Sequence, residues 1–242
     1  MWPFKRSRKI KLVANTFDKA VFDFAKPIHR PGTPNWLRNL CPVVRSKDPL
    51  TDLEVTVPTA AYCPGIKDYV KKGIIIPAWF DCEIIIRPNG SYDVSSLEFN
   101  EKVVQHPNYQ MGSEFIKDDR IFLKLSSPWA FTCKEDIDFS YGPAFYNSNF
   151  YVDNDVINPP GILNFKYQTS TNIHLAFKIK PETYRVEIKA GTPLTCLIPL
   201  SEREVDLELK LVDNETFWNL SSFPKVKFGK YYKKLNLLKV KR

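Results

Sequence analysis

A regular alternation of apolar and polar residues in the second half of the chain limits the folds that this sequence can adopt. Between Asn172 and Lys180 every second residue is apolar, namely Ile173, Leu175, Phe177 and Ile179. Successive side chains of a β-strand point to opposite faces, so the pattern predicts a strand with one buried face. The segment 204–212 repeats it. The chain therefore has to bury the apolar faces of extended strands against one another.

Other segments also have strand character and are separated by turn residues. Asn89-Gly90 lies between two of them and predicts a hairpin. A strand is also expected directly after Gly73, with Pro77 at an edge or a bulge because proline cannot donate to a ladder. The remaining expected strands are 83–87, 92–97, 120–125, 137–141, 161–167, 184–189 and 194–200.

These strands do not alternate regularly with helices, so a parallel α/β fold is not expected. We expect a mainly β fold, an antiparallel β-sandwich or jelly-roll-like barrel of the double-stranded β-helix type, with a few short peripheral helices. The helices are expected at 16–26, with Thr16 as N-cap, at 64–72, with Gly73 in the C′ position, and after Asp213 or Asn214.

The 242 residues fit one domain, because sandwiches and barrels of this length commonly fold as single units. We expect residues 1–40 to form a basic tail, a short helix and a proline-rich segment. Residues 74–212 should form the β core. Residues 213–242 should form a helix and a second basic tail.

Positive charge is concentrated at the two ends of the chain. Residues 1–11 and 225–242 hold 13 of the 35 lysines and arginines and no acid, whereas the remaining 22 face all 27 acidic residues. Affinity for a polyanion is therefore expected at the ends. The predicted partner-binding residues are Lys5, Arg6, Arg8, Lys9, Lys230, Lys233 and Lys234. An acidic protein surface, nucleic acid and an anionic membrane surface are the candidate partners, and the oligomeric state is left open.

The five cysteines are widely spread and form no Cys-x-x-Cys pair, so they indicate reduced thiols rather than a disulfide framework or a zinc ribbon. The N-terminus carries charge where a secretory signal needs an apolar run. No segment approaches the ~20 apolar residues that span a bilayer. We expect no export by a signal peptide and no transmembrane segment.

Three histidines allow one metal hypothesis. His106 and His174 together with Glu98 would form a site of two imidazoles and one carboxylate, which suits transition metals. The alternative interpretation is that the first histidine ends a turn and the second lies on a strand surface. Because the two histidines are far apart in sequence and have no closely spaced partner ligand, we expect no resident metal and no cofactor.

Two tryptophans, Trp79 and Trp129, lie among β-branched and aromatic residues. They are the candidates for a ligand-stacking platform. The alternative is that both belong to the core, as large aromatic side chains commonly do. The sequence contains no nucleophile-elbow motif and no glycine-rich phosphate loop, so it predicts no catalytic residue.

A series of short motifs carries a resemblance to a known group of proteins. The motifs are PNWLRNL, CPGIKDYVKKGIIIPAWFDCEI, SSPWAF, PPGILNF and AGTPLTCLIPLSER, which together span roughly residues 30–210. In this order they resemble an uncharacterised family of tailed-bacteriophage proteins, from T4-like phages of marine bacteria. The resemblance implies a phage origin, in the host cytoplasm or the virion, and a cupin-like shape. It implies no activity.

The segment 161–200 is also similar to the C-terminal half of the dUTPase barrel. That family carries an aspartate in its catalytic strand, whereas the segment 161–167 of this sequence holds no carboxylate, and the amide of its Asn164 cannot act as the general base. The similarity therefore implies a β shape without the reaction. The sequence predicts a non-catalytic phage protein for virion structure, assembly or binding. The alternative is a double-stranded β-helix enzyme acting on a small molecule or nucleotide.

Overall fold

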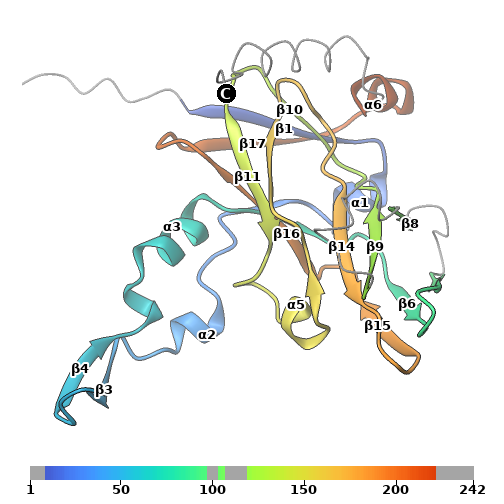
Figure 1. Cartoon of the computed structure of the whole chain (residues 1–242). Coiled ribbons are helices and arrows are strands. Elements are labelled where there is room, and N and C mark those ends of the chain that lie inside the picture. The colour runs from blue at the N-terminus through green and yellow to red at the C-terminus, as the bar shows by residue number, and fades with distance from the viewer. Residues whose placement is uncertain (1–8, 97–102, 107–118, 222–242) are drawn as a thin grey trace, which may run out of the picture.

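The computed structural model describes residues 9–96, 103–106 and 119–221 (Figure 1). The described strands form five sheets, accompanied by short helices, so the expected mainly β fold is confirmed. None of these described sheets closes into a barrel. Among the described residues, no helix has the length and apolar character needed to cross a bilayer.

The first sheet places the N-terminal segment inside the β core. Strand β1 (Ile10–Thr16) lies between β10 (Ala130–Cys133), to which it is antiparallel, and β17 (Val205–Leu211), to which it is parallel. Ile10 and Leu12 are fully buried. Residues 10–16 are therefore a core strand rather than tail and helix, because apolar residues alternate there beside the basic run.

The second sheet has the order β13 (Gly161–Asn164), β11 (Asp138–Pro143), β16 (Pro193–Pro199), β5 (Ile74–Pro77) and β2 (Ile28–His29). Strand β5 follows Gly73 directly, as predicted. Pro77 is opposite Pro193, next to a shift of register. The proline thus lies at an irregularity of the ladder, where a missing backbone donor is tolerated.

Two further sheets contain the remaining core strands. One has the order β12 (Val156–Ile157), β14 (Ile173–Lys178), β9 (Arg120–Leu125) and β8 (Val103–Gln105). The other has the order β15 (Tyr184–Ile188), β6 (Cys82–Ile86) and β7 (Tyr92–Ser95). Strands β6 and β7 form the hairpin predicted from Asn89-Gly90, and Gly90 has the positive φ of 77° that this turn requires.

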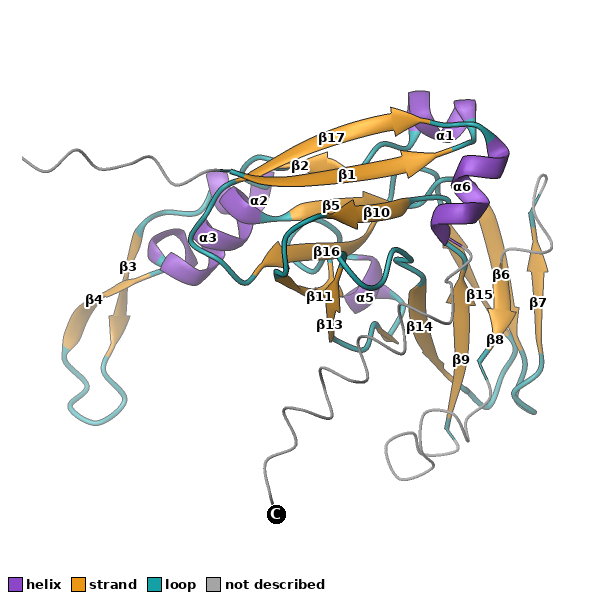
Figure 2. Ribbon diagram, turned by 90° about the horizontal axis from the view of Figure 1, so that it is seen from above, coloured by secondary structure: helices purple, strands orange, loops and turns teal. Residues whose placement is uncertain are grey.

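One apolar cluster joins these four sheets. It contains Leu12 of β1, Ile74 of β5, Ile84 of β6, Leu123 of β9 and Phe139 of β11. In Figure 2 the pair β1 and β17 runs along one side of the molecule, with β5, β10 and β16 beside it. The arrangement is that of packed open sheets around a shared core.

The short helices lie outside this core. α1 (Lys19–Phe24) is capped by Asp18, whose carboxylate accepts hydrogen bonds from the amides of Ala20 and Val21. The predicted cap, Thr16, ends β1 instead. α3 (Pro64–Lys72) is confirmed. Gly73 has φ −65° rather than a left-handed conformation, and a Cβ there would lie 2.6 Å from the carbonyl oxygen of Tyr69.

The other helices are α2 (Asn35–Arg38), the 3₁₀ turn η1 (Ala60–Tyr62), α5 (Phe150–Asp153) and α6 (Asn214–Ser221). The predicted cap of the last helix is confirmed, because the carboxylate of Asp213 accepts a hydrogen bond from the amide of Thr216 at 2.7 Å.

The fifth sheet is a separate hairpin of β3 (Val43–Lys47) and β4 (Glu54–Pro58), and it projects away from the sheets of the core (Figure 1).

Candidate functional site

The β3–β4 hairpin, residues 43–58, lies outside the core of the molecule. Every residue of β3 is exposed, and the residues of β4 are exposed or half-buried. The two strands form a sheet of their own, and its register places Val44, Val55 and Val57 on one face. An isolated two-stranded hairpin is marginally stable in water. A contact that covered its valine face would therefore stabilise it.

The tip of this hairpin holds a defined shape. The carboxylate of Asp48 accepts hydrogen bonds from the backbone amides of Leu50 and Thr51, both at 2.9 Å. The amide of Asp48 donates to the carbonyl of Leu53. The turn presents two leucines to solvent, Leu50 with 94% and Leu53 with 65% of its surface exposed. Exposed leucines on an ordered tip are typical of a contact surface.

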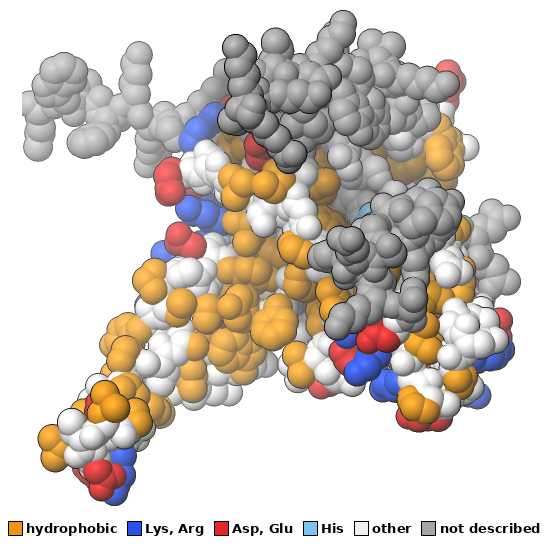
Figure 3. Space-filling view, in the orientation of Figure 1, with side chains coloured by type: hydrophobic (Ala, Val, Ile, Leu, Met, Phe, Trp, Pro, Cys, Tyr) orange, Lys and Arg blue, Asp and Glu red, His pale blue; other side chains and the backbone are white. Residues whose placement is uncertain are grey.

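Aromatic residues gather beside α3. Tyr146 contacts Trp36, Tyr69 and Phe145, with ring centres 6.1, 5.0 and 5.7 Å away. The indole of Trp36 donates a hydrogen bond to the carbonyl of Tyr146 at 2.9 Å. We call these four residues the aromatic patch. Phe145 keeps 52% of its surface exposed, and Figure 3 shows hydrophobic side chains gathered on the side of the molecule that carries the hairpin.

A hollow of about 370 Å³ adjoins the aromatic patch. Tyr69 and Tyr146 line it, together with Gly65 from the start of α3 and with Ile198 and Leu200 from the end of β16. Its polar rim includes Asp68, Lys72 and Glu202. An apolar hollow with a charged rim can receive an apolar side chain from another molecule.

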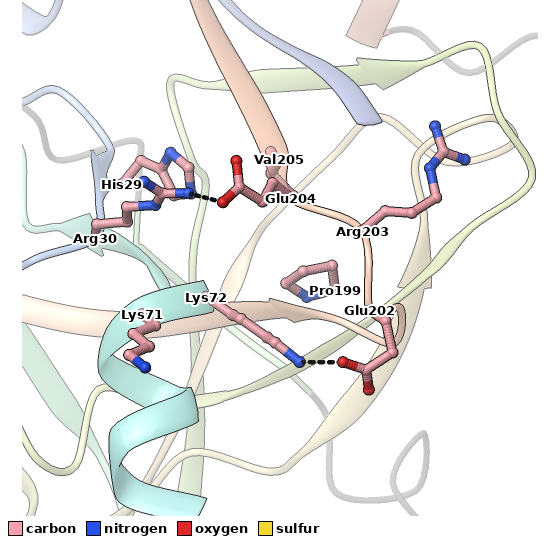
Figure 4. Close-up of a pocket in the computed structure, with 9 residues that line it drawn as sticks. All are labelled: His29, Arg30, Lys71, Lys72, Pro199, Glu202, Arg203, Glu204 and Val205. Carbon is pink, nitrogen blue, oxygen red and sulfur yellow. Dashed lines mark hydrogen bonds and ion pairs between the residues drawn. The ribbon is translucent and has the colours of Figure 1, made fainter. Parts of the chain in front are cut away.

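A charged cleft of about 450 Å³ adjoins the hollow and shares Lys72, Pro199 and Glu202 with it (Figure 4). Arg30 pairs with Glu204 at 3.2 Å, and Lys72 pairs with Glu202 at 3.2 Å. Burial and the neighbouring Arg30 lower the pKa of His29. The lining residues are His29, Arg30, Lys71, Lys72, Pro199, Glu202, Arg203, Glu204 and Val205.

The cations of this cleft are largely neutralised by the protein's own carboxylates. Arg203 pairs with Glu135 outside the cleft, and Lys72 also reaches Asp68 at 3.7 Å. The cleft therefore has little excess positive charge with which to bind an anion. The paired charges shape this surface, but they do not define a ligand site.

Among the predicted partner-binding residues, Lys9 alone lies in the described part of the chain. Its ammonium pairs with Glu204 at 3.4 Å, and the neighbouring Lys11 pairs with Glu208 at 2.8 Å. The parallel pairing of β1 with β17 brings these charges together. Lys9 is thus already paired within the chain. Lys5, Arg6, Arg8, Lys230, Lys233 and Lys234 lie outside the described residues.

The structure brings His106 and His174 together. β8 and β14 flank β9, and Lys124 of β9 is opposite both Val104 and His174. His106 follows β8, and its amide donates to the carbonyl of Phe122 at 2.8 Å. The two imidazole rings lie on the face of the sheet that points away from the core, with their centres 5.4 Å apart and their planes at 73°.

The environment of this pair is partly apolar. Phe122 and Ala176 are almost fully buried on the same face of the sheet. Burial, the neighbouring His106 and Lys124 lower the pKa of His174 to about 4. The Nδ1 atom of His106 is buried and has no hydrogen-bond partner in the part of the chain that the structure describes. Glu98, the predicted third ligand, lies outside the described residues. No group of three ligating side chains forms among the described ones.

The two candidate stacking residues are in the core. Trp79 is 7% exposed and contacts Phe80, and Trp129 is 1% exposed. The indole of Trp129 donates a hydrogen bond to the carbonyl of Ala25 at 3.1 Å. Both rings pack in the core in this structure, as the alternative interpretation expects.

Asn164, the amide of the segment that resembles the dUTPase barrel, ends β13. Its side-chain amide is buried and donates hydrogen bonds to Asp136 at 2.9 Å and to Asp138 at 2.7 Å. Its carbonyl oxygen accepts from the amide of Lys166. The amide thus joins β13 to the segment before β11, which is a structural function.

Comparison with known proteins adds no family assignment. No protein-family model matches the chain, and no curated protein matches it.

The sequence analysis did not identify the residues of the hairpin tip. The signal for them is Asp48-Pro49-Leu50-Thr51-Asp52, a turn-forming segment between the two short strands. β3 is exposed throughout, and β4 alternates only between exposed and half-buried residues, so neither strand has the fully buried positions of a core strand.

Proposed function

We propose that this protein is a non-catalytic β protein that assembles with other protein subunits through the β3–β4 hairpin. The observation that carries this proposal is the projecting hairpin, whose strands have no sheet neighbour among the described residues and whose ordered tip exposes two leucines. A monomer gains little from such an element, because an uncovered two-stranded hairpin adds little stability of its own.

The neighbour that fits the hairpin best is a second copy of this chain. The aromatic patch and its hollow offer an apolar surface for the tip leucines, and they belong to the same molecule as the hairpin. Two different surfaces of one chain that complement each other form a head-to-tail contact. Such contacts repeat, so they build rings or filaments.

The proposal also includes a biological setting. The sequence motifs between residues 30 and 210 resemble those of tailed-bacteriophage proteins, which supports a function in virion structure or assembly, in the host cytoplasm or the virion. The cupin-like shape rests on the same resemblance. The basic terminal segments would add contacts to an acidic surface or nucleic acid.

The double-stranded β-helix enzyme is the second candidate, and the proximity of His106 and His174 favours it. The described residues supply this pair with no third ligating group. We therefore place assembly first.

Sedimentation velocity over a range of protein concentrations tests the proposal. We expect wild type to form species larger than the monomer, and Leu50→Ser with Leu53→Ser to shift the equilibrium to the monomer. The matched control is Phe24→Ser, which removes a side chain of similar exposure on α1. In Figure 2 this helix lies at the opposite end of the molecule from the hairpin. A monomeric wild type, or equal association of all variants, would overturn the proposal.

A further inference from the structure

The pair formed by His106 and His174 has no part in assembly through the hairpin. Both imidazoles lie on the outer face of the sheet formed by β12, β14, β9 and β8, and they reach across β9 towards each other. Strands two positions apart in a sheet are about 10 Å from each other. The distance of 5.4 Å between the ring centres therefore means that both side chains lean inward over β9.

This distance matches that of two imidazoles bound to one metal ion. A metal–nitrogen bond of about 2.0–2.1 Å places each ring centre about 3 Å from the ion, so a tetrahedral angle separates the centres by about 5 Å. The observed value is 5.4 Å. The two ring planes lie at 73° to each other. Rotation about the terminal side-chain torsion, which is soft in histidine, can direct one nitrogen of each ring to a common point.

An unpartnered atom points to a missing ligand at this place. Nδ1 of His106 is buried and makes no hydrogen bond to any described residue, although a buried polar atom is almost always satisfied. A metal ion bound by this nitrogen, or by the other ring nitrogen with a water at Nδ1, would satisfy it. The expectation of no metal assumed that the two histidines are separated, and the structure removes that assumption.

We propose that His106 and His174 bind one divalent transition-metal ion of the class that prefers imidazole ligands, Ni²⁺, Zn²⁺, Co²⁺ or Cu²⁺. The two histidines supply two ligands, and the remaining coordination positions are filled by water. Lys124, opposite His174, adds a positive charge nearby that opposes cation binding. The site therefore binds its ion reversibly rather than holding it as a permanent structural metal.

The chain allows a well-controlled test because it has three histidines, and His29 lies in the charged cleft, outside the pair. The experiment is calorimetric titration of the full-length protein with Ni²⁺ alone. We expect about one ion per chain for wild type and for His29→Gln. His106→Gln and His174→Gln should each weaken binding at least about 100-fold, more than the loss typical of a residue that merely orients a ligand.

A second measurement on wild type does not depend on the folding of variants. Paramagnetic Ni²⁺ at one equivalent should broaden the ring-proton resonances of two histidines and leave those of the third sharp. The proposal is overturned if wild type binds no Ni²⁺ at about 1 mM, if the three variants bind alike, or if the ion broadens no pair of histidine signals. None of these outcomes depends on whether the hairpin mediates assembly.

Discussion

At the scale of single residues, burial divides the five cysteines into two groups. Cys41 and Cys63 are exposed, and the other three are buried. Burial raises the pKa of Cys82 to about 12 and that of Cys196 to about 11, and it also raises the pKa of Cys133. The thiolate is the reactive form, so a raised pKa and poor solvent access both slow the reaction of the three buried thiols.

We therefore expect two thiols per chain to react rapidly with a disulfide reagent at pH 8, and five after denaturation. The three buried thiols should react faster only under conditions that unfold the core. Absorbance of the released thiol, read against time, gives both numbers. Rapid reaction of four or five thiols in the folded protein would show that the core is not packed as described.

Individual residues also show what can be predicted from sequence. Gly90 and its turn were predictable because the conformation depends on neighbouring residues only. The contact of His106 with His174 was not, because it depends on β8 and β14 flanking the same strand. Strand order is a property of the whole sheet, and the local pattern of a single sequence does not contain it.

At the scale of elements, β1 differs most from the sequence expectation. Its apolar residues Ile10, Leu12 and Ala14 alternate and are fully buried. The basic residues before and within this segment led to its interpretation as a tail. Lys9 and Lys11 point outward and pair with Glu204, just before β17, and with Glu208 of β17, which is compatible with a central strand. The predicted strands of the second half, by contrast, are confirmed within a few residues of their ends.

Substitution of Leu12 tests the position of β1. We expect Leu12→Ala to lower the free energy of unfolding by about 2–5 kcal/mol, because it leaves a cavity among fully buried side chains. Lys11→Ala, on the opposite face of the same strand, should leave the unfolding midpoint almost unchanged. Urea denaturation of both variants measures the difference. Equal midpoints would contradict a buried β1.

At the scale of the whole molecule, the positions of its charged and apolar surfaces indicate how the protein associates. Five of the 13 terminal basic residues precede or begin β1, and two of these, Lys9 and Lys11, are paired within the chain. The hairpin, the aromatic patch and the hollow beside α3, by contrast, present apolar side chains on one side of the molecule. We infer that apolar contacts make the main interface and that charge at the termini adds to it.

Hydrogen exchange at low and high protein concentration tests this inference most directly. In the dilute protein, amides of residues 43–58 should exchange rapidly, because β3 and β4 pair with no other described strand. At high concentration we expect their exchange to slow, together with that of the segments around Trp36 and Tyr146. Exchange of the hairpin that stays rapid at every concentration, while another surface becomes protected, would contradict the account.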